Sequence, residues 1–426
     1  MEQTARVIIT ESNYQFKNQF FVFKLFFKYM IQIIGLLNPL GCGKEMISSR
    51  IERVEESATI KSSKRAKNMI ASGVDVINFT LGEPDFDTPR NITDATYRAM
   101  LAGETHYSAV AGIPELRSAI ADKLRSENGI PTASENVMVT PGAKLAIFES
   151  MMTLIEDGDE VLLFDPAWVS YDACVKMAGG KTVWIETDSE KNYFSKKDLL
   201  EYITDKTKMI VINTPCNPTG AVYDKNQLKE IADLAIDHDF LVMSDEMYEK
   251  IIYDKKNYSI ASFDNMHERT ITINGFSKAY AMTGWRLGYM DAPQHIFKSL
   301  EKIQSHTISN VTTFVQYGGV EALTGPQDEL HKMQAAFKER RGVLIEGLRK
   351  LGLKCPMPDG AFYAYPDVSE FGSGEEITDR LLEEAHVAVS PGIAFGESGK
   401  NNIRISYAAS VEKIQEALVR MEKVFG

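Results

Sequence analysis

Short apolar runs alternate with amphipathic stretches through the middle of the chain. Between the runs, apolar residues recur at the helical spacing of about 3.6 residues, as in residues 228–235. Continuous apolar runs such as Ile210-Val211-Ile212 are typical of strands in a sheet that is covered on both faces. The alternation therefore predicts an α/β domain with a largely parallel sheet. The predicted strands are Val137–Thr140, Glu160–Phe164, Thr182–Glu186, Met209–Asn213, Phe240–Ser244, Thr270–Asn274 and Arg286–Asp291.

The pattern changes after about residue 323. A charged helix is predicted at Asp328–Leu351, and short strands are predicted at Ala361–Tyr365 and Asn402–Tyr407. This mixture indicates a second, smaller α+β domain. A last helix would place one apolar face against it, made of Val411, Ile414, Leu418, Met421 and Val424.

These changes divide the chain into four parts. We expect residues 1–45 to be an apolar N-terminal extension that is not part of the fold. Residues 46–90 should form an N-terminal arm and part of the smaller domain, because the strand–helix alternation starts only later. The large domain is expected in 91–322 and the small C-terminal domain in 323–426.

The first 45 residues differ from the rest in charge. They carry five basic and three acidic residues, whereas the other 381 residues carry 42 basic and 56 acidic ones. Within residues 20–37 the clearly polar residues are Lys24, Lys28 and Gln32, which would form one stripe on a helix. A signal or anchor segment, an interfacial amphipathic helix and a start placed too early all fit this pattern. We favour a start at Met46, because a complete enzyme-like pattern follows it.

Composition narrows the class of protein. Apolar residues make up 44% of the 426 residues and charged residues 25%, which excludes a disordered, collagen-like or disulfide-dense chain. The net charge of −12 argues against a nucleic-acid partner. The four cysteines show no Cys-x-x-Cys pairing, so we expect free thiols in a reducing, cytoplasmic setting and no metal site. Beyond residue 45 the chain has no other long apolar run, so no membrane role is expected.

Polar residues follow several predicted strands, where the ligands of open α/β sheets gather. Gly142, Ala143 and Lys144 form a turn that opens a helix, whose free N–H groups can hold a phosphate. A plain strand–helix turn would give the same pattern. Asn217 follows another strand, in a turn made rigid by two prolines and a glycine. That rigidity suits an amide that must be held in place, and a simple turn is the alternative.

Charged residues follow two further strands. Asp245 comes directly after an apolar strand, and a buried carboxylate needs a cationic or N–H partner; a helix N-cap is the other interpretation. Lys278 lies beyond the next strand, eight residues before Arg286. Lysine can form a Schiff base, and arginine can bind phosphate or carboxylate with two donors. The glycine-rich, aromatic setting of this pair is not typical of solvated surface residues.

In their joint order and spacing, these residues resemble the class I/II aminotransferases of pyridoxal-phosphate (PLP) fold type I, and most closely their aspartate aminotransferase-like branch. The resemblance covers essentially all of residues 46–426. Its motifs are Leu81-Gly82-Glu83-Pro84-Asp85-Phe86-Asp87-Thr88-Pro89, His106-Tyr107 with Gly112, Leu116 and Arg117, Pro166-Ala167-Trp168-Val169-Ser170-Tyr171, Asn217-Pro218-Thr219-Gly220, Asp245-Glu246-x-Tyr248, Ser277-Lys278 with Arg286, Gly360-Ala361-Phe362-Tyr363, Pro391-Gly392-x-x-Phe395-Gly396 and Arg404-x-Ser406-Tyr407.

The resemblance implies PLP as cofactor and a large domain with a mostly parallel seven-stranded sheet between helices. Lys278 would hold PLP covalently and then move the proton between the substrate Cα and cofactor C4′. Asp245 would pair with the pyridinium nitrogen, which keeps the ring an electron sink. The other implied cofactor contacts are Asn217 and Tyr248 at the ring oxygen, Trp168 on the ring face, and Gly142, Ala143, Lys144, Ser277 and Arg286 around the phosphate.

The resemblance also implies how substrate binds. Arg404 would take the substrate α-carboxylate in a bidentate pair, with Asn217, Trp168 and the main chain at Gly82 beside it. Tyr107 would reach the phosphate of the partner subunit. The implied assembly is therefore a homodimer with shared active sites.

The expected function is amino-group transfer between an L-amino acid and a 2-oxo acid in two half-reactions. Aspartate with 2-oxoglutarate is the first expected pair, and Ser57-Ala58-Thr59 resembles a segment that folds over the site in this branch. Aromatic amino acids, alanine and prephenate are alternatives. A carbon–sulfur β-lyase would keep the same cofactor residues but release pyruvate and ammonia. A non-catalytic regulator would need a DNA-binding domain, for which residues 1–45 are too short and too apolar.

Overall fold

The structure is a computed structural model, and it describes residues 47–56, 58–187 and 196–426. The chain divides into two compact units, Met1–Arg53 and Val54–Gly426. The described part of the first unit holds one short helix, α2 (Ser49–Glu52), which the Ser48 side chain caps. The extension predicted in 1–45 lies outside the described residues, as do the side chains of residues 57–59.

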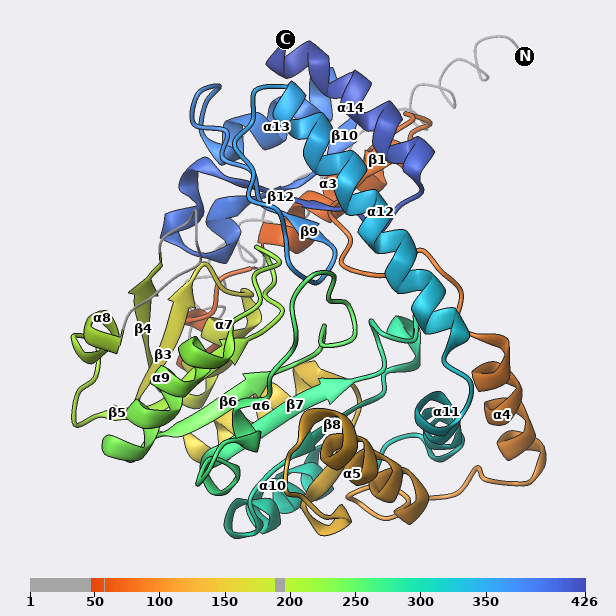
Figure 1. Ribbon diagram of the computed structural model, residues 1–426, viewed down its shortest axis with the longest axis vertical. Coiled ribbons are helices and arrows are strands. Elements are labelled where there is room, and N and C mark those ends of the chain that lie inside the picture. The colour runs from red at the N-terminus through yellow and green to blue at the C-terminus, as the bar shows by residue number, and fades with distance from the viewer. Residues whose placement is uncertain (1–46, 57, 188–195) are drawn as a thin grey trace, which may run out of the picture. The chain divides into compact units, whose positions relative to one another are not determined.

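The second unit is built on a seven-stranded sheet with the order β2-β8-β7-β6-β5-β3-β4 (Figure 1). Pairs among β4, β3, β5, β6 and β7 are parallel, while β8 runs antiparallel to β7 and β2. The mostly parallel sheet is therefore confirmed, and each strand lies within three residues of its predicted bounds at either end. The strands are β2 (Val137–Thr140), β3 (Glu160–Asp165), β4 (Lys181–Glu186), β5 (Thr207–Asn213), β6 (Leu241–Asp245), β7 (Thr270–Gly275) and β8 (Gly288–Asp291).

Helices cover both faces of this sheet, as the continuous apolar strands predict. In β3, Val161 and Leu163 pack into one cluster, whereas Leu162 and Phe164 pack into another on the opposite face. The first cluster is closed by α6 (Ala143–Leu154), α7 (Ser170–Ala178) and α10 (Gln294–Thr307). The second is closed by α8 (Lys196–Leu200) and α9 (Lys225–Asp237).

A third and larger cluster lies at the β2–β8 edge of the sheet and continues into the C-terminal part of the chain. Near the sheet it receives α5 (Pro114–Asn128) and α11 (Thr313–Thr324), and α11 also contacts α4 (Arg90–Leu101). Phe337 and Leu344 of α12 (Asp328–Lys350) are buried in the same cluster. This long helix runs past the sheet toward the C-terminal elements (Figure 1).

The C-terminal part forms a smaller α+β arrangement. Strands β11 (Ser390–Pro391), β12 (Ile403–Ser406) and β9 (Tyr363–Ala364) form an antiparallel sheet in that order. The early strand β1 (Ile77–Asn78) pairs in parallel with β10 (Val387–Ala388), so the residues before the large sheet contact this part. Its helices are α3 (Ala58–Ala71), α13 (Gly374–Glu384) and α14 (Val411–Phe425).

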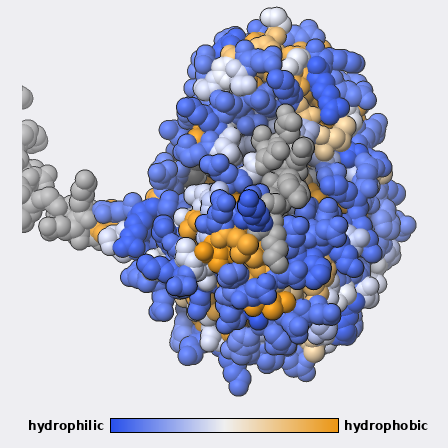
Figure 2. All heavy atoms as spheres, turned by 60° about the vertical axis from the view of Figure 1, so that its left-hand side comes forward, coloured by the Kyte–Doolittle hydropathy of each residue, from blue (hydrophilic) through white to orange (hydrophobic). Residues whose placement is uncertain are grey.

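Most of the described surface on the face drawn in Figure 2 is hydrophilic, with one compact apolar area near its centre. Among the described residues, no helix has the length and apolarity that crossing a bilayer requires. The same residues contain no cluster of His, Cys, Asp and Glu that could hold a metal ion. Cys174, Cys216 and Cys355 are buried free thiols, as predicted; Cys42 lies outside the described residues.

Candidate active site

A cavity of about 660 Å³ lies where β5, β6 and β7 end. The carboxyl ends of parallel strands share one edge of a sheet, so polar residues far apart in sequence meet there. Eleven of the predicted site residues line the cavity: Gly82, Ala143, Lys144, Trp168, Asn217, Asp245, Tyr248, Ser277, Lys278, Arg286 and Arg404. It is also lined by residues to which the sequence gave no role in the site, among them Lys64, Lys67, Tyr171, Asn213 and Tyr363.

Asp245 is the last residue of β6, and its carboxylate is buried. Its Oδ2 accepts a 2.6 Å hydrogen bond from the Tyr171 hydroxyl, and its Oδ1 accepts one of 3.1 Å from the Met247 N–H. Burial raises the pKa of the Asp245 carboxyl, while these two bonds and the nearby Lys278 act to lower it. The contact to Met247 closes a turn, and no helix begins at this point, so the helix N-cap interpretation of Asp245 is wrong. No ion pair to Asp245 exists among the described residues, which leaves it able to receive a cationic N–H from a ligand.

Asn213 joins two predicted site residues. At the end of β5, its Nδ2 donates to the Asp245 carbonyl at 3.0 Å, and its Oδ1 accepts from the Asn217 N–H at 2.8 Å. A polar residue at the end of an apolar strand is the same signal that pointed to Asp245, so Asn213 could have been found in the sequence. It fixes the turn from which the Asn217 side chain reaches Arg404.

Lys278 lies just beyond β7. Its Nζ donates to the Gly82 carbonyl oxygen. The pKa of Lys278 is lowered to about 8, chiefly by burial; Arg404 and Arg286 also act to lower it, whereas Glu83 and Asp245 act to raise it. Near neutral pH, a lysine with such a pKa is a neutral, nucleophilic amine far more often than an ordinary lysine, whose pKa is about 10.4. This is the amine that Schiff-base chemistry requires.

Arg286 and the start of α6 form an anion-binding end of the cavity. Gly142 precedes α6 with a φ of 85°, and a Cβ at this position would lie 2.8 Å from Arg286 Nη2. The guanidinium also donates to the Pro141 carbonyl at 3.4 Å. Glycine therefore permits both the backbone conformation and the close approach of Arg286. Ser277 also lines this end of the cavity. The N–H groups at the start of α6, the Ser277 hydroxyl and the Arg286 guanidinium together form a place where a phosphate would fit.

Arg404, in β12, is 4% exposed and has no carboxylate partner among the described residues. Its Nη1 donates to Asn217 Oδ1 at 3.0 Å, and its Nη2 donates to the Thr80 carbonyl at 2.8 Å. Its Nε is buried without a hydrogen-bond partner in the described structure. Burial lowers the pKa of the guanidinium. A buried cation that lacks an anion is costly, so an anionic ligand such as a carboxylate would stabilise it.

Two aromatic residues complete the predicted set. The Lys144 Nζ lies 4.8 Å from the centre of the Trp168 ring, which lines the cavity. Tyr107 is 91% exposed and does not line the cavity of its own chain. Tyr280 and Met282, which follow Lys278 closely in the sequence, are both buried in the large cluster.

The fold and this cavity define the PLP fold type I class: a mostly parallel seven-stranded sheet with a lysine and a buried carboxylate where its strands end. The family described as Aminotransferase class I and II matches residues 74–421, and the chain belongs to that family. The chain is therefore an aminotransferase.

Known proteins of this kind are similar over nearly their whole length. A probable aspartate aminotransferase from Methanocaldococcus jannaschii is 45% identical, over 89% of this chain and 100% of the relative. An aromatic-amino-acid aminotransferase from Thermococcus litoralis is 43% identical, over 89% of this chain and 98% of the relative. The solved structure of aspartate aminotransferase from Thermus thermophilus with maleate has a TM-score of 0.86 and 40% identity, covering 89% of this chain and 99% of that one.

Proposed function

We propose that this chain is a PLP-dependent aminotransferase that moves an amino group between an L-amino acid, with aspartate favoured, and a 2-oxo acid, with 2-oxoglutarate favoured. One observation carries the proposal: a lysine amine of lowered pKa, a buried carboxylate and a buried arginine without an anion share one cavity. The lysine amine can react with a carbonyl, the buried carboxylate can pair with a pyridine nitrogen, and the arginine can bind a carboxylate.

The residues present fit PLP. Asp245 would hold the ring nitrogen and Lys278 the aldehyde carbon, while Asn217 and Tyr248 would contact the ring oxygen. The phosphate would take the N–H groups of Gly142 and Ala143 together with Arg286, and Ser277 and Lys144 belong to the same end. When bound, PLP supplies a carbonyl that links to an amine and a ring that accepts electron density from the substrate Cα.

The chain's own residues then supply binding and proton transfer. Arg404 binds the substrate α-carboxylate with two donors, and its hydrogen bond to Asn217 fixes the plane of the guanidinium. Trp168 and the main chain at Gly82 bound the substrate position. The neutral amine of Lys278 is the base that takes a proton from the substrate Cα and returns it elsewhere. The lowered pKa of Lys278 suits both the uptake and the release of this proton, because near pH 8 the amine can be either neutral or charged.

The charges in the cavity support an anionic side chain in the substrate. Six cations line it and Asp245 is its one acidic residue within the described chain. A phosphate and an α-carboxylate would engage Arg286 and Arg404. With Lys144 at the phosphate end, Lys64 and Lys67 remain, and a distal carboxylate would balance them. This favours aspartate and 2-oxoglutarate over aromatic amino acids and alanine. Prephenate, the other alternative from the sequence, also carries a second carboxylate and fits the same charges.

We also propose a homodimer with shared active sites, in the cytoplasm. Tyr107 is 91% exposed and close in sequence to the exposed apolar residues Tyr97 and Leu101, at 56% and 71%. An exposed group of this kind favours a protein partner, and Tyr107 would reach the phosphate of the other subunit. Buried free thiols favour a reducing compartment. Light scattering of the purified chain tests the dimer.

The function is tested with the purified chain, PLP and a panel of amino donors and 2-oxo acids. We expect aspartate with 2-oxoglutarate to give the highest kcat/KM. Lys278→Ala should lose both turnover and the visible absorbance of lysine-linked PLP. A variant that keeps both would contradict the proposed role of Lys278. Pyruvate and ammonia formed without any 2-oxo acid would identify a β-lyase instead.

A further inference from the structure

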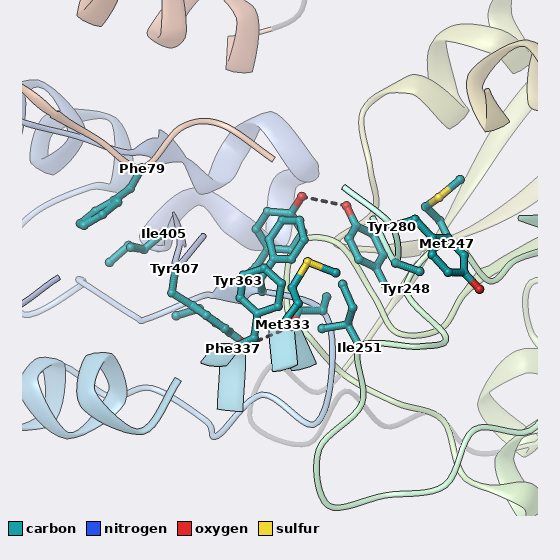
Figure 3. Packing of buried hydrophobic residues seen from close by; sticks show 14 of the residues in the cluster. Phe79, Met247, Tyr248, Ile251, Tyr280, Met333, Phe337, Tyr363, Ile405 and Tyr407 are labelled. Carbon is teal, nitrogen blue, oxygen red and sulfur yellow. Dashed lines mark hydrogen bonds between the residues drawn. The ribbon is translucent and has the colours of Figure 1, made fainter. Parts of the chain in front are cut away.

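Tyr363 lies at the start of β9 and brings a phenol from the C-terminal sheet to the cavity. Its hydroxyl is 2.8 Å from the hydroxyl of Tyr248, and the two side chains are buried. Figure 3 shows the two hydroxyls pointing toward each other from opposite sides. The sequence assigned Tyr248 to the cofactor and gave Tyr363 no role.

Gly82 makes room for the Tyr363 hydroxyl. A Cβ at Gly82 would lie 2.4 Å from the Tyr363 hydroxyl oxygen and 3.5 Å from Cζ. Gly82 does not have a positive φ, so the space and not the backbone conformation calls for glycine here. The carbonyl oxygen of the same glycine accepts a hydrogen bond from the Lys278 amine. The Tyr363 hydroxyl therefore lies against the residue that holds the reactive amine.

The ring of Tyr363 also supports Arg404. The Arg404 Cζ lies 4.6 Å from the centre of the Tyr363 ring and 4.9 Å from that of Phe395. Cation–π contacts stabilise an arginine more strongly when it is desolvated, as Arg404 is. Since no carboxylate within the described chain pairs with it, the guanidinium takes its orientation from these rings and from its hydrogen bonds to Asn217, Thr80 and Ser390.

We propose that Tyr363 is a positioning residue with two tasks: its hydroxyl orients the Tyr248 hydroxyl, and its ring holds Arg404 in place. This rests on the proposed PLP-dependent function. Each phenol has one proton, so when Tyr363 donates to Tyr248, the Tyr248 proton is free for an acceptor in the cavity. A hydroxyl that also accepts a hydrogen bond is the stronger donor. Tyr363 thereby makes Tyr248 a directed donor to the cofactor's ring oxygen.

The first test compares Tyr363→Phe with Tyr363→Leu in the PLP-loaded enzyme. Phenylalanine keeps the ring and removes the hydroxyl, so we expect kcat to fall roughly tenfold with KM unchanged. Leucine removes both, so KM for amino donors should rise as well. Tyr407→Phe is the matched control, because Tyr407 is a buried tyrosine whose hydroxyl bonds to Tyr253 and which does not line the cavity.

The second readout needs no substrate. A ring oxygen that receives a weaker hydrogen bond holds negative charge less well, so the proton shared with the lysine linkage is lost at higher pH. The pH midpoint of the bound-cofactor absorbance should therefore move upward in Tyr363→Phe and stay in place in Tyr407→Phe. An unchanged midpoint in Tyr363→Phe overturns the proposal, whichever substrate the enzyme uses. Absence of that absorbance from the wild-type protein would instead refute PLP binding and, with it, both proposals.

A double-mutant cycle tests the contact itself. Gly82→Ala should lower kcat by pushing the Tyr363 hydroxyl from its place. In the Tyr363→Phe background the same alanine meets only the ring edge, so its effect should be several-fold smaller. Equal effects of Gly82→Ala in both backgrounds would show that the hydroxyl is not held there.

Discussion

The hydroxyl of Tyr171 donates a 2.6 Å hydrogen bond to the carboxylate of Asp245, although 74 residues separate the two in the chain. Tyr171 is on α7 and 1% exposed, and Asp245 ends β6. Because a buried carboxylate without a donor tends to take up a proton, Tyr171 helps Asp245 to remain ionised. An ionised Asp245 is what the pyridine nitrogen of the proposed cofactor requires.

Tyr171→Phe should therefore weaken PLP binding. A hydrogen bond to a charged group contributes about 1.5–3 kcal/mol, so we expect the Kd of PLP to rise at least tenfold while the packing of the ring is kept. Cofactor titration followed by absorbance measures this. Tyr223→Phe is the control, since Tyr223 is also buried, in the cluster on the other face of the sheet. An effect of similar size in Tyr223→Phe would show that loss of packing, and not loss of the bond, is the cause.

The large domain was predictable because its signals are local. A run such as Ile210-Val211-Ile212 has few ways to bury all its side chains other than as a strand covered on both faces, and β5 lies there. The antiparallel course of β8 was not predictable, because it depends on how residues 276–287 turn back rather than on any pattern within the strand. The pairing of β1 with β10 joins residues that are 310 apart, and neither two-residue strand has a pattern of its own.

The candidate site was predictable where chemistry shows in the residue type. Asp245 and Lys278 are charged residues next to apolar strands, and both line the cavity. Arg404, which lies inside β12, was assigned through the family resemblance. Tyr171 and Tyr363 were missed as functional residues, because a buried tyrosine looks the same in sequence whether it packs or donates. Their roles arise from tertiary contacts, as does the lining of the cavity by α3, whose side chains face it only once the helix is docked.

Reaction of the apoprotein with PLP should depend on pH through Lys278. The neutral amine is the nucleophile, and burial lowers its pKa to about 8. The rate of reconstitution, followed by absorbance after mixing, should rise with pH and level off above about pH 9. An ordinary lysine, with a pKa of about 10.4, would give a rate that still climbs at pH 10. Such a climb would contradict the environment of Lys278 described above.

His267 should make stability depend on pH. Its Nε2 lies 3.1 Å from Asp291 Oδ2, and this hydrogen bond raises the pKa of His267 above 6.5 even though burial opposes it. The folded state thus binds the proton more tightly, so the stabilisation is complete below pH 6.5 and is lost as pH rises through the folded-state pKa. We expect His267→Gln to lower the free energy of unfolding by roughly 1–2 kcal/mol at pH 6 and by less at pH 9.

Thermal unfolding at the two pH values measures the effect of His267→Gln. His331→Gln on α12 replaces an exposed histidine and should leave the Tm unchanged at both. A Tm deficit of His267→Gln that is the same at pH 6 and pH 9 would mean that packing of the imidazole, and not its charge, stabilises the fold.

Lys64 and Lys67 should select for an anionic side chain in the substrate. Together with Ile60 and Ser63 they form the face of α3 that lines the cavity. Ala66 on the same helix is buried against Leu382 and Ala388, which holds this face toward the cavity. A cation near a distal carboxylate in a partly exposed site contributes on the order of 1 kcal/mol, or about fivefold in binding, and two such cations contribute more.

Replacing both Lys64 and Lys67 by Ala should therefore raise the KM for aspartate and 2-oxoglutarate roughly tenfold. The KM for alanine and phenylalanine should stay within twofold, because Arg404 still binds their α-carboxylate. Lys61→Ala is the matched control: Lys61 is an exposed lysine on the same helix, three residues before Lys64, and it does not line the cavity. If all donors lose affinity alike, the lysines act on the cofactor or the α-carboxylate. If no donor loses affinity, Lys64 and Lys67 do not contact the substrate side chain, and any preference for dicarboxylates must come from another part of the cavity or from the partner subunit.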